Sequence, residues 1–229
     1  MKNRIVISAA MLTMAFGMQA NAGLPGLKIP GAATAEAATA AATAATDMSG
    51  NSQEAIVQNF ANALGIVLKG QAELDLAFGN KESAAALTSM AEAMAGGATT
   101  KADIKKATEV SAEAQESNAE KLAAGEELSD EARAHYVNGL VLSAEGVIAT
   151  KALSQDAADF GASAKDQISS ASMMKKAKLI KSLSAGMFVA KELPGFTADL
   201  MKNFEMLVTY ANSAEIPVPA DATDFLAAL

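Results

Sequence analysis

The chain has no Cys, no Trp and a single His among its 229 residues. The absence of Cys excludes disulfides, thiolate metal sites, iron–sulfur clusters and cysteine nucleophiles. One His argues against a zinc, haem or di-iron centre, and no phosphate-binding loop or dinucleotide fingerprint is present. Aromatic residues make up only 4% of the chain. We therefore expect no cofactor, no metal and no enzymatic activity.

Positive charge is also scarce. The chain has 18 Lys and Arg against 26 Asp and Glu, a formal net charge of −8. Nucleic-acid binders need clustered Lys and Arg to displace counterions from phosphates, so we expect no nucleic-acid partner. At 51% hydrophobic residues, the chain is too apolar to be wholly disordered, and it is long enough for one sizeable core or two small ones.

The first 22 residues read as a secretory signal peptide. Lys2 and Arg4 precede an apolar stretch over 5–18, and the small residues Ala20 and Ala22 then form a cleavage pattern before Gly23. The stretch is too short for a membrane anchor, as is the uncharged run over 55–68, so we expect no transmembrane span in the mature chain. The mature protein is predicted to be periplasmic or secreted. It would keep 16 Lys and Arg against 26 Asp and Glu, a net charge of −10.

Residues 23–50 form a low-complexity segment. Pro25 and Pro30 stand among glycines, and an Ala/Thr tract follows over 32–46. Proline resists helix and central strand, and the tract has no large apolar side chain to dock on a core. We interpret 23–50 as a linker or a frayed helix.

From Asn51 onward, apolar residues recur at three- and four-residue steps, and no stretch alternates long enough for a strand. The pattern predicts an all-α fold, an antiparallel bundle of about six helices over 51–215. A C-terminal tail over 216–229 would hold one short helix capped by Asp221. The first predicted helix is capped at Asn51 and ends at Gly79 and Asn80, and a second, shorter helix ends at Gly96. The third is capped at Thr100 with Asp103 and ends at Gly125, and the fourth is capped at Ser129. The fifth spans about Ser170 to Leu193, and the last helix runs from Phe196 to Ala211.

Four further expectations concern packing. The helix opened by Ser129 is apolar almost all round, so it is predicted to be the most buried. The small residues near Phe160 and Gly161 are expected to separate it from the next helix, and Pro194 with Gly195 to break or kink the helix they follow. Gly65 and Gly70 lie inside a helical pattern and are assigned to close helix contact.

The single His is assigned a structural or pH-sensing role. His135 stands four residues after Glu131 on a predicted helix, which would let the carboxylate orient the imidazole. Such a pair is common on helices, so the spacing does not indicate catalysis.

Two charge patterns are candidate interaction sites. Carboxylates share one face of the helix over 100–124, at Glu109, Glu113, Glu116 and Glu120. Lysines stand beside Met and Leu on a later helix, at Lys175, Lys176, Lys178 and Lys181. The lysines could touch anionic lipid, grip a partner helix, or pair with the acidic stripe of the same molecule. We favour the intramolecular pairing.

The leading hypothesis is a non-enzymatic envelope protein that acts by protein interaction or self-association, chaperone-like or scaffold-like, with a groove that accepts a protein segment. The alternative is a protein that binds lipid or a membrane through the basic amphipathic helix, with rearrangement at the membrane as one form of this hypothesis.

Overall fold

The computed structural model describes residues 52–125, 127–220 and 222. This part of the chain is all-α, with six helices packed together. The predicted fold class and helix number are confirmed. The predicted signal peptide, the predicted linker over 23–50, and the predicted caps at Asn51 and Asp221 lie outside the described residues. The helices are α2 (Gln53–Ala77), α3 (Lys81–Ala95), α4 (Lys101–Ala124), α5 (Asp130–Ser170), α6 (Met173–Ser182) and α7 (Ser184–Ser213).

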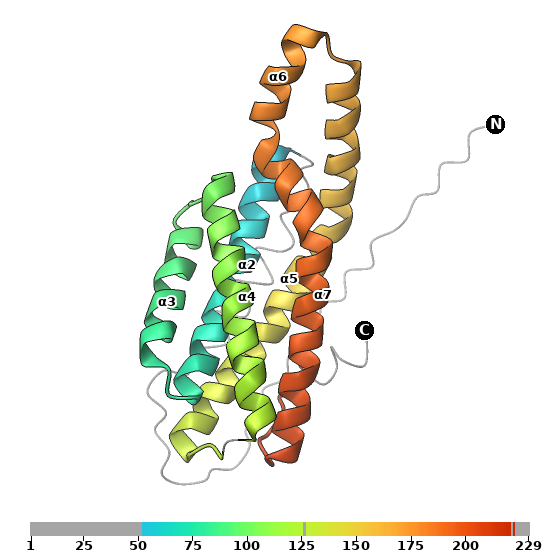
Figure 1. The fold of residues 1–229 in the computed structure, drawn as a ribbon. Coiled ribbons are helices and arrows are strands. Elements are labelled where there is room, and N and C mark those ends of the chain that lie inside the picture. Colours follow the sequence, from blue (N-terminus) through green and yellow to red (C-terminus); the bar gives the residue numbers. More distant parts are fainter. Residues whose placement is uncertain (1–51, 126, 221, 223–229) are drawn as a thin grey trace, which may run out of the picture.

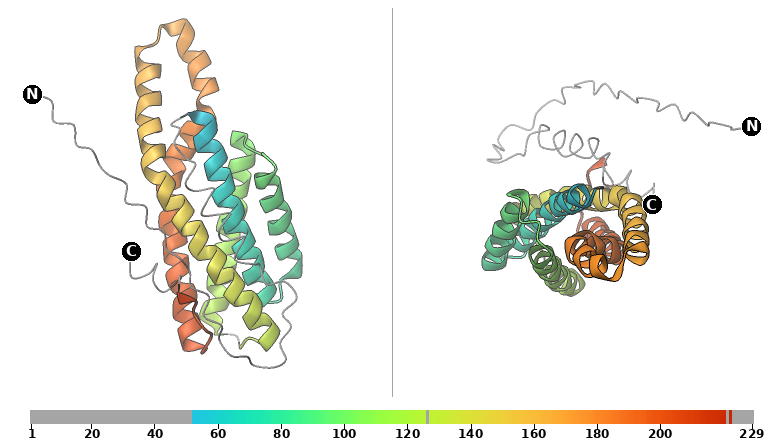
Figure 2. Two further views of the ribbon diagram at one scale, coloured as in Figure 1. Left: turned by 180° about the vertical axis from the view of Figure 1, so that it is seen from behind. Right: turned by 90° about the horizontal axis from the view of Figure 1, so that it is seen from above.

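The helices lie side by side along one long axis (Figure 1). From α2 to α5 each helix reverses the direction of the one before, and α6 and α7 then descend together on the final pass. Seen from behind, α5 rises past the tops of its neighbours and forms a projecting hairpin with α6 (Figure 2). None of these helices is both long and apolar enough to cross a membrane.

The helix ends follow the predicted local chemistry. Thr100 and Asp103 form a reciprocal capping box, and the Ser129 hydroxyl accepts a hydrogen bond from the Ala132 amide. Gly79 and Gly125 have φ angles of 78° and 66°, which L side chains rarely adopt. Ser52 caps α2 through its side chain.

The most buried helix is α2, not the helix opened by Ser129. Fifteen of the 25 residues of α2 are buried, against 11 of the 41 residues of α5. Helix α2 is central because it packs against α3, α4, α5 and α7. Gly70 permits its close approach to α5: a Cβ atom there would lie 3.1 Å from Leu142 Cβ. The sequence interpretation of Gly70 is confirmed.

Two hydrophobic clusters follow each other along the axis. The one nearer the hairpin is built around Phe60, Leu64 and Leu153. The other contains Tyr136 and Phe204. The Tyr136 hydroxyl donates to the Leu207 carbonyl at 2.7 Å, which satisfies a polar group in a fully buried ring.

The predicted separation near Gly161 is wrong. Helix α5 continues to Ser170, because Phe160 is buried and its ring packs on Gly186 of α7, where an added Cβ would lie 2.6 Å from the ring. The packing of this segment outweighs the modest helix cost of Gly161.

The predicted helix from Ser170 to Leu193 is also wrong, because it is two helices that meet at Leu183. The hydroxyls of Ser182 and Ser184 donate to the carbonyls of Leu179 and Lys181, a pattern that bends helices. Pro194 does not end α7, which continues through it to Ser213. The buried side chains on both sides of Pro194 hold that segment to the core.

Candidate functional site

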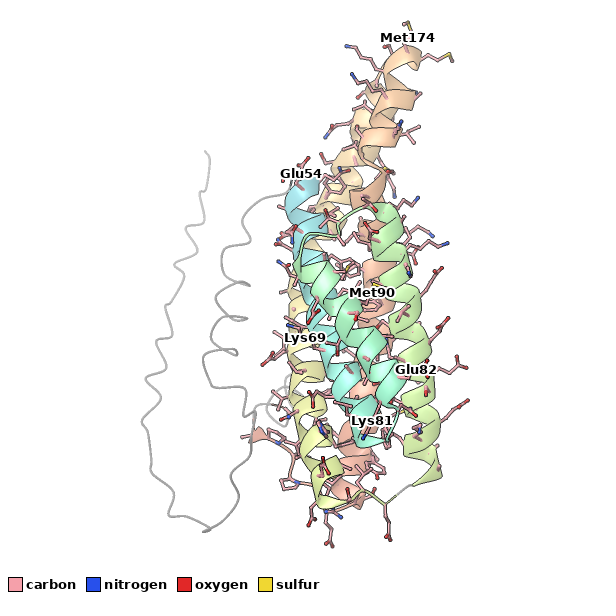
Figure 3. All side chains as sticks on the ribbon, turned by 90° about the vertical axis from the view of Figure 1, so that its left-hand side faces the viewer. Glu54, Lys69, Lys81, Glu82, Met90 and Met174 are labelled. Carbon is pink, nitrogen blue, oxygen red and sulfur yellow. The ribbon has the colours of Figure 1, made fainter. Side chains whose placement is uncertain are left out.

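The four candidate lysines lie on α6, in the projecting hairpin. Helix α6 has no buried residue. Lys175, Lys178 and Lys181 are exposed, and Lys176 is half-buried. Met173 and Met174 begin the helix with 90% and 93% of their surface exposed. Figure 3 places Met174 at the far end of the molecule, beyond the tops of α2 and α3.

The acidic stripe lies on α4, where its members are all exposed: Glu109, Glu113, Glu116 and Glu120. Lys105 pairs with Glu109 at 3.4 Å across one turn of the same helix. Both side chains are more than half exposed, so this pair contributes little to stability.

The favoured pairing of lysines with the acidic stripe is not observed. No ion pair joins the two sets within the part of the chain that the structure describes. Helix α6 packs on α5 and α7 and projects beyond the body, whereas the stripe continues down α4 toward the opposite end. The two charge patterns are therefore separate surfaces.

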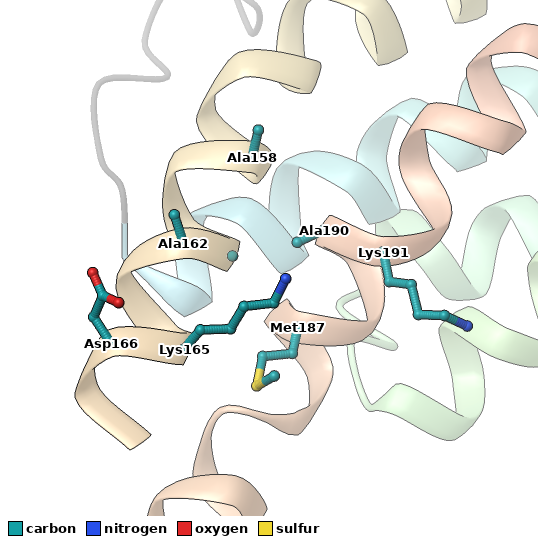
Figure 4. A pocket seen from close by; sticks show the side chains of 8 residues that line it. Ala158, Ala162, Lys165, Asp166, Met187, Ala190 and Lys191 are labelled. Carbon is teal, nitrogen blue, oxygen red and sulfur yellow. The ribbon is translucent and has the colours of Figure 1, made fainter. Parts of the chain in front are cut away.

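A half-open groove lies between α5 and α7, with a volume of about 610 Å³. Its lining is mostly small and apolar: Ala158, Gly161, Ala162, Met187 and Ala190, with Lys165, Asp166 and Lys191. The two helices approach closely where an added Gly161 Cβ would lie 3.1 Å from Ala190 Cβ. Figure 4 shows Lys165 extending across the gap toward α7, whereas Asp166 and Lys191 point away from it.

A second groove joins the base of the hairpin to the start of α4. It is lined by Lys101, Lys105, Ile180, Ser184, Met187, Phe188, Lys191 and Glu192. The Lys101 ammonium lies 5.6 Å from the centre of the Phe188 ring, within cation–π distance. Lys191 pairs with Glu192 at 2.8 Å. The start of α4 therefore adds positive charge to the end of the molecule that carries α6.

His135 contacts a different carboxylate from the one expected. Its Nδ1 lies 2.8 Å from Glu73 Oε2 on α2, so the pair joins α5 to α2 instead of linking His135 to Glu131. Both side chains are about one-third exposed. The described residues contain no group of three or more His, Asp or Glu suited to a metal ion.

A layer of polar side chains is buried between α2, α4 and α7. The Gln71 amide donates to the Ser111 hydroxyl at 2.8 Å, and the Asn203 amide donates to the Gln115 carbonyl at 3.4 Å. Asp75 is 1% exposed, and within the described part of the chain neither of its carboxylate oxygens has a hydrogen-bond partner of ordinary geometry. Burial raises the pKa of Asp75, and nearby Ser83, Asn80 and Lys121 partly offset the rise.

Sequence reasoning did not find the α5–α7 groove. The sequence does contain one indication of the groove, since Ala158 and Ala162 are four residues apart and lie on one face of α5. Spacing on one helix does not reveal which helix it meets, so Met187 and Ala190 of α7 were not predicted as its other wall. The charge that Lys101 and Lys105 add beside α6 was missed for the same reason.

Comparison of the chain with protein families, with curated proteins and with solved structures found no match. The surfaces of the molecule are therefore the basis for its proposed function.

Proposed function

We propose that this protein is an exported, non-enzymatic helical protein of the cell envelope, periplasmic or secreted, which holds a segment of a partner protein in the α5–α7 groove. Its action would be chaperone-like or scaffold-like. The observation that carries the proposal is the groove itself, a half-open channel of about 610 Å³ whose walls are mainly Ala, Gly and Met side chains.

The groove lining favours a polypeptide segment as its occupant. Small side chains let another backbone come close, and Met187 is a flexible, polarisable side chain that adapts to different partners. Lys165 extends across the gap, where its ammonium offers a donor to the carbonyl groups of an extended chain.

The one His also supports a binding role over catalysis. His135 is engaged by Glu73 in a contact between α2 and α5, outside the groove. Among the described residues, His135 pairs with Glu73 and with no serine or threonine, so this pair lacks the nucleophile that a triad requires.

The test is suppression of aggregation of reduced insulin by the mature protein at near-equal molar ratio. Dithiothreitol, which starts that aggregation, has no target in a chain without Cys. We expect Ala162→Glu to weaken the suppression by more than about tenfold, because a bound apolar segment would desolvate the new carboxylate. Ala162 is exposed, so the substitution leaves the core intact.

The matched control is Ala152→Glu, which adds the same charge to an exposed alanine of α5 outside the groove. It should suppress aggregation as the unchanged protein does. Equal activity of both variants, or no suppression of insulin and of two further unfolded clients by the unchanged protein, would contradict the proposal.

A further inference from the structure

Helix α6 presents a different surface from the groove, and the hairpin to which it belongs is mainly positive. From residue 161 to 183 the chain carries five lysines and a single acid, Asp166, although acids outnumber bases in the chain as a whole. Lys101 and Lys105 of α4 border the same end through the groove that they share with Ile180. The acidic stripe of α4 begins only at Glu109 and extends away from this end.

Charge is therefore separated along the long axis of the molecule. A negatively charged surface would repel most of the acidic body and attract the end that carries α6, so the hairpin would approach it first. With this orientation, a protein of net negative charge can still approach an anionic surface.

The exposed face of α6 carries an apolar stripe with lysines on both sides. Met173, Ala177 and Ile180 are spaced four and three residues apart, so they lie along one stripe, and all three are exposed. On a helical projection Lys176 lies on one side of the stripe, and Lys178 and Lys181 lie on the other. An apolar stripe bordered by lysines matches the boundary between acyl chains and headgroups, because the lysine stems lie along the apolar layer while their ammonium groups reach the headgroups.

The shape of this end also favours lipid over protein. Met173 and Met174 stand at the convex turn of a projecting hairpin, with about nine-tenths of their surface free. A bilayer interface accommodates a convex apolar tip of any outline, whereas a protein partner would need a matching concave pocket.

We infer that α6 docks the protein on an anionic lipid surface, with Met173 and Met174 entering the interface and the α6 lysines contacting headgroups. This inference goes beyond the proposed holding of a protein segment and uses a separate surface. The contact is peripheral and reversible, because only one short helix takes part.

The experiment is co-sedimentation of the full mature protein with vesicles of phosphatidylglycerol and phosphatidylcholine in equal amounts, and with vesicles of phosphatidylcholine alone. We expect binding to the anionic vesicles only, with an affinity that falls as salt is raised. The triple variant K175E/K178E/K181E should bind on the order of 100-fold more weakly, since each basic residue near an anionic surface adds a similar increment. All three side chains are exposed, so folding should not change.

The matched control is K69E/K81E/K202E, which makes the same change in net charge on the body. All three lysines are exposed. Figure 3 shows Lys69 and Lys81 far from Met174. This variant should bind within about threefold of the unchanged protein, because charges farther away than the Debye length are screened.

The apolar part is tested by M173S/M174S against Ile148→Ser, a change at an exposed apolar residue of α5 that is 47% exposed. Only M173S/M174S should bind the anionic vesicles more weakly, and the binding that remains should still fall as salt is raised. Equal binding to both vesicle types, or full binding by the triple hairpin variant, would overturn the inference.

Poly-L-glutamate is the probe for an acidic protein partner. Lysine-dependent binding to this polymer together with no binding to anionic vesicles would assign the hairpin to a protein and overturn the lipid inference. The insulin assay with Ala162→Glu is independent of these results, so failure of one proposal is distinguishable from failure of the other.

Discussion

Gly139 and Gly195 are both helical glycines, but only Gly139 has atoms in the space that a Cβ would fill. At Gly139 of α5, an added Cβ would lie 2.7 Å from Leu74 Cγ and 3.0 Å from the Gly70 carbonyl oxygen of α2. At Gly195 of α7, no atom of the described residues lies within 4 Å of that position. The two glycines therefore have opposite effects on stability. Gly139 permits close contact between α2 and α5, whereas Gly195 only lowers the helix propensity of α7.

Gly139→Ala should lower the free energy of unfolding by about 1–3 kcal/mol, because Leu74 is fully buried and has to shift. Gly195→Ala should raise it by up to about 1 kcal/mol, the difference in helix propensity between the two residues. Urea unfolding followed by circular dichroism measures both. If the two variants changed stability in the same direction, the assigned contact between α2 and α5 would be wrong.

At the scale of the helices, the boundaries were predictable where one residue decides them. The Thr100 and Ser129 caps and the glycines that follow α2 and α4 were found because capping and positive φ angles depend on local chemistry. The break between α5 and α6 was misplaced near Gly161, because contacts with α7 keep α5 helical and those contacts are not encoded in local spacing. The lysines of α6 were identified, but their projection beyond the body depends on the length of α5.

The hairpin and α2 should differ in local stability. Helix α6 has no buried residue, whereas α2 is more than half buried. Opening of α6 exposes little apolar surface, so its amides should exchange with deuterium faster than those of α2 by on the order of 10³-fold or more. Exchange measured by mass spectrometry on peptides covering 173–182 and 56–72 would show the difference. Similar protection of the two peptides in the free protein would mean that α6 is covered, for example by self-association.

At the scale of the whole molecule, the buried polar layer couples folding to pH. Asp75 lies on the central helix α2 at 1% exposure, and its carboxylate oxygens lack ordinary hydrogen-bond partners among the residues that the structure describes. Sequence periodicity did not reveal it, because Asp75 stands next to the apolar Leu74 and Leu76 and reads as an ordinary acid of a helix. Only the packing of α2 against α3 and α4 shows that this position is inside.

Burial raises the pKa of Asp75 above its ordinary value of 3.8. Between that value and the raised pKa, the carboxyl is therefore protonated in the folded protein and ionised in the unfolded chain. The contribution of Asp75 to stability is therefore fully present below pH 3.8 and is lost as the pH rises through the raised pKa. Asp75→Asn cannot ionise, so the variant does not show this loss. The free energy of unfolding of the variant minus that of the unchanged protein should therefore increase as the pH rises, and then level off. Urea unfolding from about pH 3.5 to pH 8 measures the difference, with Glu82→Gln as the control that removes an exposed carboxylate and should not show this gain. A difference that shrank with rising pH would mean that the folded protein stabilises the ionised carboxylate, which requires Lys121 or Asn80 to contact Asp75 more closely than the structure shows.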